Sequence, residues 1–207
     1  MDKYDVKMAL KACYSARPRD FSIVDVPEMQ FLAVDGQGDP NSSQSYSEAV
    51  EGLFSVAYTL KFHSKAVHGR DFTVGPLEGL WRGSEEDYIR RDKVNWKWTM
   101  MIPQPDWIGA DTLATAREKA WSKKRLPAIQ ELKLMSLHEG PSVQILHVGP
   151  YDNEGPVLAR LHHEYMPNNG LARNGDHHEI YLNTPGRTAP EKLKTILRQP
   201  VRSLDAD

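Results

Sequence analysis

Runs of apolar and β-branched residues predict the strands of the first half of the chain. Two such runs flank Val26-Pro27-Glu28, and each has the length and composition of a strand. Residues 94–102 alternate apolar and polar positions, which predicts a strand with a strongly apolar face. The strands expected here are 21–26, 29–35, 71–81 and 94–102, the last one ended by Pro103.

Helical spacing of apolar residues appears between these strands. Residues 44–62 place apolar side chains three and four positions apart, which predicts an amphipathic helix with Ser45 or Ser47 as its cap. Residues 109–130 are charged and also helix-compatible, with Asp111 as a cap.

The second half of the chain follows the same order. The elements expected here are two strands about a tight turn within 131–150, a helix over 154–166 and a strand over 177–183. A capping-box spacing at Thr188–Glu191 predicts a final helical turn or two over Leu193, Ile196 and Leu197, closed by Pro200.

An internal repeat relates the two halves. The run 27–34 (PEMQFLAV) matches the run 141–148 (PSVQILHV), 114 residues later, at four of eight positions. In each half a strand precedes the run, and a helix and a further strand follow it. One such unit exposes a sheet edge and face, whereas two can extend one sheet and bury helices on one side. We therefore predict an α+β fold from a duplicated unit, with a concave surface on the other face.

The repeat also sets the expected domain organisation. Residues 1–20 form a short helical or irregular arm, and residues 21–207 a single domain. That domain consists of two repeats, about 21–105 and 131–201, joined by a helical linker. The charged residues 82–93 predict an exposed turn.

Composition excludes several classes of protein. The 207 residues are 40% hydrophobic and 26% charged, a normal balance for a soluble globular chain. A formal charge of −2 gives no global attraction to nucleic acid or to an anionic membrane, so we expect neither as a partner. Cys13 is the single cysteine, which excludes an internal disulfide. No secretory leader or membrane-length apolar run is seen, so a cytoplasmic protein is expected.

Aromatic residues are the first candidates for a binding site. Flat rings together with methionine suit a planar hydrophobic ligand, although the same residues could equally be core. The candidates for ligand binding are Tyr58, Trp81, Trp96, Trp98 and Met100.

Glu179 is the most informative acidic residue. It lies inside a predicted strand, where glutamate is disfavoured and costly to bury unpaired. Tyr181 shares its face by the two-residue period of a strand. A carboxylate in an aromatic pocket can bind a cation or act as a general base, so Glu179 and Tyr181 are the catalytic candidates. The alternative is an exposed edge strand with Glu179 in water.

Motifs for metals and cofactors are missing from the sequence. The pairs His162-His163 and His177-His178 offer ligand atoms, but adjacent residues diverge and cannot converge on one ion unaided. No nucleotide-binding glycine motif and no G-x-S-x-G run occurs. We expect neither a metal nor a cofactor.

Several further motifs occur together over residues 14–201. They are 26–41 (VPEMQFLAVDGQGDPN), 76–81 (PLEGLW), 96–98 (WKW), 147–152 (HVGPYD) and 178–194 (HEIYLNTPGRTAPEKLK). Taken together they resemble the gyrase-inhibitor-like (GyrI-like) small-molecule-binding family. The resemblance implies two strand-helix-strand-strand units about a pseudo-twofold axis, with a ligand cleft between them.

The resemblance also carries functional expectations. Some relatives are drug-sensing domains of transcription regulators, in which a buried glutamate meets cationic aromatic drugs. Stand-alone relatives resemble hydrolases that open cyclopropane rings in DNA-alkylating natural products of the duocarmycin and yatakemycin type. The family's glutamate maps onto Glu179 and its aromatic walls onto Tyr58, Trp81, Trp98 and Tyr181. Only about 20 residues precede the first strand, too few for the regulators' helix-turn-helix domain.

Three functions therefore compete. In the first, Glu179 deprotonates a water that opens a strained ring, and Tyr181 or another phenol hydrogen-bonds the developing oxyanion. In the second, the protein sequesters hydrophobic or cationic molecules, with Glu179 as a counter-ion and the aromatic rings supplying cation–π contacts. In the third, it binds DNA gyrase as an inhibitor, as the family name suggests, which needs an exposed surface patch.

Overall fold

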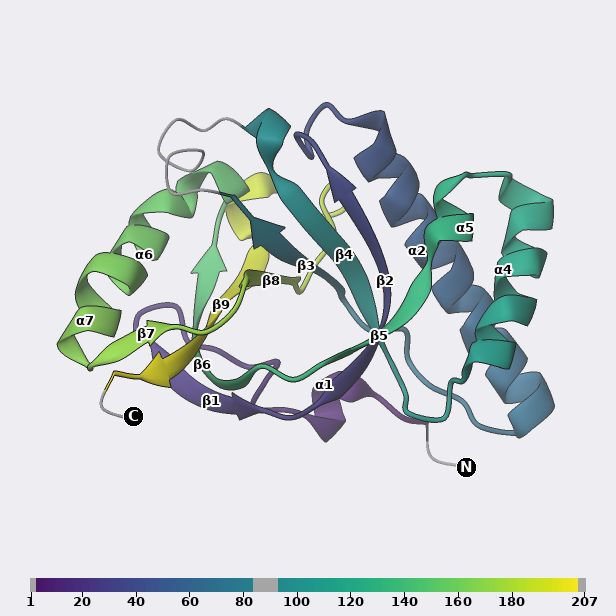
Figure 1. The fold of residues 1–207 in the computed structure, drawn as a ribbon, viewed down its shortest axis with the longest axis horizontal. Coiled ribbons are helices and arrows are strands. Elements are labelled where there is room, and N and C mark those ends of the chain that lie inside the picture. The colour runs from purple at the N-terminus through teal and green to yellow at the C-terminus, as the bar shows by residue number, and fades with distance from the viewer. Residues whose placement is uncertain (1–2, 84–92, 205–207) are drawn as a thin grey trace. The chain divides into compact units, whose positions relative to one another are not determined.

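The computed structural model describes residues 3–83 and 93–204, in which strands and helices are mixed (Figure 1). The chain divides into two compact units. Unit 1 comprises Met1–Ala9 and Met29–Leu137, and unit 2 comprises Leu10–Glu28 and His138–Asp207. Within each unit the named strands pair antiparallel. The α+β class with an antiparallel sheet, predicted from the repeat, is confirmed.

The sheet of unit 1 has the strand order β3-β4-β2-β5. Its strands are β2 (Met29–Gln37), β3 (Leu77–Arg82), β4 (Lys97–Gln104) and β5 (Lys133–Leu137). In this register Gly36 lies opposite Trp98 and Trp81 lies opposite Trp98 from the other side. Aromatic residues of β3 and β4 therefore share one face of the sheet with the glycine of β2.

Helix α2 (Gln44–His63) packs against β2 and β4 of this sheet, with α4 (Ala110–Lys124) and α5 (Ala128–Glu131) beside it (Figure 1). The predicted apolar stripe is confirmed, because Leu53, Ala57 and Leu60 are buried. Helix α2 continues into a π-helical turn, η1 (Ser64–His68), and the short α1 (Val6–Ala9) completes the unit.

The N-cap of α2 is Ser43, rather than the predicted Ser45 or Ser47. Its side chain accepts a hydrogen bond from the Tyr46 backbone N–H at 3.3 Å. This bond satisfies one of the backbone donors that the first helical turn leaves without a partner. Ser45 remains involved, since its hydroxyl lies 2.7 Å from that of Ser43.

Ser43→Ala should therefore lower the free energy of unfolding by about 1 kcal/mol, the usual value of a serine cap. Chemical denaturation of the variant and of Ser42→Ala measures the difference. Ser42 lies one residue outside the cap, and the structure gives its side chain no capping role. Equal losses in the two variants would contradict the capping role of Ser43.

Unit 2 has the strand order β1-β6-β9-β8, with the short β7 paired to β9. Its strands are β1 (Ser22–Val26), β6 (Gly140–Val148), β7 (Leu171–Arg173), β8 (His177–Tyr181) and β9 (Lys194–Ser203). A helical segment follows β6, made of η3 (Tyr151–Asn153), α6 (Gly155–Arg160), the π-helix η4 (Leu161–Tyr165) and α7 (Met166–Asn168). Its Leu161 and Met166 form a core with Val143 of β6 and Val201 of β9.

The first strand of each predicted repeat joins the sheet of the other unit. Strand β1 pairs with β6, whereas β5 pairs with β2. The turns around Pro27 and Gly140 are therefore crossings from one unit to the other. A sequence pattern of two strands about a short turn is typical of a hairpin. Here β1 and β2 belong to different units, and so do β5 and β6.

Strand β9 replaces the final helical turns predicted over Leu193, Ile196 and Leu197, and that prediction is wrong. Only the 3₁₀ turn η5 (Pro190–Lys192) is helical here. Within unit 2, β9 runs between β6 and β8, and Thr195–Val201 are buried on both faces. A strand buried on both sides loses the alternating pattern, so its apolar spacing can imitate that of a helix.

Two prolines lie inside strands that they were predicted to end. Pro103 pairs with Phe31 across β2, and Pro200 pairs with Ser142 across β6. On its other side Pro103 lies beyond Met101, the last residue of β4 paired with β3. Pro200 lies in the gap between Arg198, which pairs with β8, and Val201, which pairs with β7. A residue without an N–H is tolerated where one neighbour has ended.

The remaining predicted elements have these outcomes. The helix over 109–130 is confirmed as α4 and α5. Its predicted cap is wrong, because Gly109 is at the N-cap position and Asp111 lies in the first turn. The helix over 154–166 and the strand over 177–183 are confirmed as α6–η4 and β8. The strand over 94–102 begins at Lys97, after a 3₁₀ turn, η2 (Lys93–Asn95). Most of the predicted turn at 82–93 falls on residues 84–92, outside the described residues.

Candidate functional site

Strand β8 of unit 2 presents three polar side chains on one face. His177, Glu179 and Tyr181 alternate along the strand and so point to the same side. The Tyr181 hydroxyl donates to Glu179 Oε2 at 2.7 Å, and His177 Nε2 lies 3.5 Å from Glu179 Oε1. The Glu179 side chain is 13% exposed, so its carboxylate is largely withdrawn from water. The two residues predicted as catalytic are thus in direct contact.

Tyr151 adds a second phenol to this group. Its ring meets the ring of Tyr181 edge-on, with centroids 5.5 Å apart and planes at 72°. Burial raises the pKa of Tyr151 to about 12, and the negative charges of Glu154 and Glu179 act in the same direction. The Tyr151 hydroxyl therefore stays protonated at neutral pH and remains a hydrogen-bond donor.

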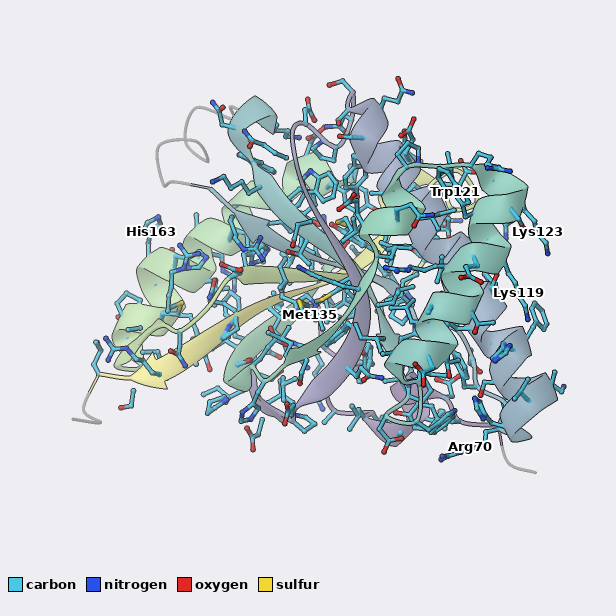
Figure 2. All side chains as sticks on the ribbon, turned by 45° about the vertical axis from the view of Figure 1, so that its right-hand side comes forward. Arg70, Lys119, Trp121, Lys123, Met135 and His163 are labelled. Carbon is cyan, nitrogen blue, oxygen red and sulfur yellow. The ribbon has the colours of Figure 1, made fainter. Side chains whose placement is uncertain are left out.

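The π-helix η4 brings a second histidine toward β8. Burial lowers the pKa of His162 to about 4, and the charges of His177, Arg173 and His163 contribute. His162 is therefore neutral at physiological pH. Its neighbour His163 is exposed on the outside of the helical segment (Figure 2). Turns of π-helix are rare and occur frequently at functional sites.

This arrangement combines a buried carboxylate, two phenols and two imidazoles on one side of unit 2. A carboxylate held by one hydrogen bond can accept a proton from water, and a protonated phenol can stabilise a developing oxyanion. Among residues 3–83 and 93–204, no group of three or more His, Cys, Asp or Glu side chains is placed to share a metal ion. The side chains of this group can transfer protons and form hydrogen bonds.

A second candidate feature is the aromatic cluster of unit 1, made of Tyr46, Trp81, Trp96 and Trp98. The ring of Tyr46 stacks on Trp81 at 6.3 Å and meets Trp98 edge-on at 5.3 Å. Trp96 meets Trp81 edge-on at 5.8 Å. Trp81, Trp98 and Met100 are almost fully buried, and Trp96 is partly exposed. These residues build the core of unit 1, and their contact with a ligand stays a prediction.

Tyr58 lies outside this buried cluster, and its contact with a ligand stays a prediction. It is 49% exposed on α2, whereas Tyr46, in the first turn of the same helix, reaches the tryptophans. The sequence analysis did not single out Tyr46. The available signal was its place in the first turn of the helix that follows the Gly36 strand. A helix that packs on the sheet containing the preceding strand brings its first turn close to that strand.

His178, the residue after the site histidine His177, belongs to a buried ionic network on the opposite face of β8 from Glu179. Glu139 Oε1 lies 3.0 Å from His178 Nδ1, and Glu139 Oε2 accepts from Arg198 Nη1 at 2.8 Å. Arg198 also donates to the Cys13 backbone carbonyl, which ties the segment before β1 to the sheet. Burial acts to raise the pKa of Glu139, but the charges and hydrogen bonds of His178 and Arg198 lower this pKa to about 2. The network fixes β8 one residue away from Glu179.

Comparison with known proteins places this fold and site in context. The GyrI-like small molecule binding domain matches residues 19–202. Among solved structures, an uncharacterized conserved protein from Listeria innocua is 39% identical with a TM-score of 0.87, covering 97% of this chain and 100% of its own. A hydrolase from Listeria innocua, encoded by lin2189, is 40% identical with a TM-score of 0.86 and the same coverage.

More distant structures share the fold alone. The C-terminal domain of EcmrR is 12% identical with a TM-score of 0.58, and it covers 89% of this chain and 98% of its own. Among curated proteins, none matches the sequence.

The fold and the matched region define a small-molecule-binding protein. The chain belongs to the GyrI-like small molecule binding domain family, as its sequence motifs indicate. Within the part of the chain that the structure describes, no helix is both long and apolar enough to cross a membrane.

Proposed function

We propose that the protein is a hydrolase that opens the cyclopropane ring of planar, DNA-alkylating molecules of the duocarmycin and yatakemycin type, and so detoxifies them. The observation that carries this proposal is the largely buried Glu179 carboxylate, held by the Tyr181 hydroxyl at 2.7 Å. A similar protein at 40% identity is described as a hydrolase, which supports hydrolytic chemistry on this fold.

The proposed reaction begins at the carboxylate. Glu179 accepts a proton from a water molecule while the water oxygen attacks the strained ring carbon of the substrate. The carbon–carbon bond of the cyclopropane breaks, and its electron pair moves through the conjugated ring to the carbonyl oxygen, which becomes a phenolate. Return of the proton gives a phenol and a primary alcohol, so one water is consumed and no other reactant is needed. Release of ring strain supplies much of the driving force.

Tyr181 and Tyr151 have different roles in this reaction. The single proton of the Tyr181 hydroxyl is directed to Glu179, so Tyr181 holds the carboxylate. Tyr151 keeps its proton up to a pH of about 12, so it is the better candidate to donate to the developing phenolate. The sequence left this role to Tyr181 or another phenol, and the hydrogen bond from Tyr181 to Glu179 supports Tyr151 for it.

Glu179→Gln should reduce ring opening by at least about a hundredfold, because an amide cannot take the proton from water. Purified protein is incubated with a cyclopropane-containing compound of this class, and the ring-opened product is quantified by mass spectrometry in ¹⁸O-labelled water. Glu164→Gln is the matched control, since Glu164 is exposed on η4. An unchanged rate in Glu179→Gln would refute the proposed mechanism.

A non-catalytic binding protein is the second candidate. A carboxylate beside the rings of Tyr151 and Tyr181 is also suited to a hydrophobic cation, through charge and cation–π attraction. In that case the wild-type protein binds the compound saturably and returns it unchanged. Affinity for a lipophilic cation would then fall in Glu179→Gln, while the control variant binds as the wild type does.

A further inference from the structure

His177 is a buried side chain with unsatisfied hydrogen-bonding capacity. It is 4% exposed, and within the described residues neither of its ring nitrogens makes a hydrogen bond. Buried polar side chains are nearly always hydrogen-bonded, and an exception needs an explanation, of which a catalytic role is one. His178, the next residue, lies on the other face of β8 and is engaged by Glu139. The unsatisfied histidine is therefore the one that shares a face with Glu179.

One carboxylate oxygen of Glu179 lies close to His177. Nε2 of His177 lies 3.5 Å from Oε1, whereas Oε2 is already held by Tyr181. An ordinary N–H···O bond spans 2.7–3.2 Å, so a movement of about half an ångström would close the gap. Such contacts are often loose in a free enzyme and tighten only in its complex with substrate.

We propose that His177 is the positioning residue of Glu179: its imidazole donates from Nε2 to Oε1 when the site is filled, so that His177 and Tyr181 together hold both carboxylate oxygens. The inference rests on the proposed hydrolytic function. Fixing both oxygens sets the orientation of the carboxylate, so that its remaining lone pairs are held in place for the water from which Glu179 takes a proton.

The charged and titratable groups around this pair fit the assignment. His162 faces His177 from η4 and is neutral above about pH 4, so it adds no competing positive charge. Arg173 and His163 act on His162. On the other side of Glu179 are Tyr181 and the protonated Tyr151, with Glu154 near Tyr151. Of these groups, His162 and Tyr151 are thus neutral at physiological pH.

Two substitutions of His177 separate positioning from packing. The side-chain amide of glutamine can place an N–H near the position of Nε2, whereas that of asparagine reaches only to the position of Nδ1. If donation from Nε2 matters, His177→Gln should keep kcat within about threefold of wild type. His177→Asn should lose about tenfold or more in kcat with KM changed by less than about threefold. The acid limb of its kcat/KM profile should also move to higher pH, because the carboxylate has lost a donor.

His163→Gln is the control for the loss of a histidine, since His163 is exposed on η4 (Figure 2). It should leave kcat and the pH profile unchanged. Equal losses in the glutamine and asparagine variants, or a loss in KM alone, would overturn the positioning role.

A measurement on the wild-type protein needs neither a variant nor turnover. ¹⁵N NMR of the imidazoles should show His177 protonated at Nε2 when tetraphenylphosphonium is added as a cationic probe. Protonation at Nδ1 alone would overturn the assignment. If the wild type opens no cyclopropane ring, the proposed hydrolysis fails, while this spectrum still decides whether Nε2 of His177 carries the proton that donation to Glu179 requires.

Discussion

Gly36→Ala should lower the free energy of unfolding by at least about 3 kcal/mol, although it adds a single methyl group. A Cβ at Gly36 would lie 2.0 Å from Cη2 of Trp98, whose ring crosses the glycine of the neighbouring strand. The ring has little room to withdraw, because it is 1% exposed and Tyr46 meets it edge-on at 5.3 Å. Overpacking of a rigid core costs 1–3 kcal/mol, and more where backbone and ring cannot move apart.

Chemical denaturation of Gly36→Ala against Gly109→Ala measures this effect. Gly109 also lies in unit 1, but a Cβ there meets no atom within 4 Å. A double-mutant cycle with Trp98→Ala tests the cause, because the cost of Gly36→Ala should largely disappear once the ring is removed. A loss below about 1 kcal/mol, or additive losses in the cycle, would show that the ring can move aside.

The contact that could be predicted from the sequence is one that depends only on spacing within a single strand. Glu179 and Tyr181 are two positions apart in a strand, so the two-residue period was enough to place them on one face. The same rule applied to His177 would have added the third member of the group. In the sequence, His177 stands out as a possible metal ligand beside His178, and that pairing hides its place on the face of Glu179.

Contacts between distant segments could not be derived in this way. Arg198 meets Glu139 across 59 positions and Cys13 across 185, and no local pattern encodes such a pairing. The exchange of β1 and β5 between the units has the same origin, because each strand is compatible with a hairpin or with a distant partner. Only the packed sheet decides between them.

Strand β9 shows how burial on both faces removes the periodic signal. Thr195, Arg198 and Gln199 are polar, yet they are as buried as Ile196 and Leu197. Arg198 donates to the Cys13 carbonyl in the segment before β1, and Gln199 donates to the Gly175 carbonyl in the loop between β7 and β8. Polar residues therefore stand where a periodic pattern predicts an exposed face. The same spacing of apolar residues then resembles a short helix.

Glu139→Gln should destabilise the protein by about 3–5 kcal/mol at pH 7, the usual cost of breaking a buried ion pair from one side. The carboxylate and the guanidinium of Arg198 are 3% and 1% exposed, and their atoms lie 2.8 Å apart. Removing the negative charge leaves Arg198 buried without its counter-ion, and it also weakens the contact with His178. Denaturation of Glu139→Gln is compared with Glu191→Gln, an exposed glutamate in the same unit.

The pH dependence of this difference identifies its cause. The pKa of Glu139 is about 2 in the folded chain and 4.5 when unperturbed, so the charged form is favoured by folding. Its contribution is complete above about pH 4.5 and is lost as the pH falls toward 2, where the folded carboxylate also takes up a proton. The stability gap between wild type and Glu139→Gln should therefore shrink over this range. A gap that stays constant down to pH 2 would mean that Glu139 contributes through its shape and hydrogen bonds, and that its charge adds nothing to the stability of unit 2.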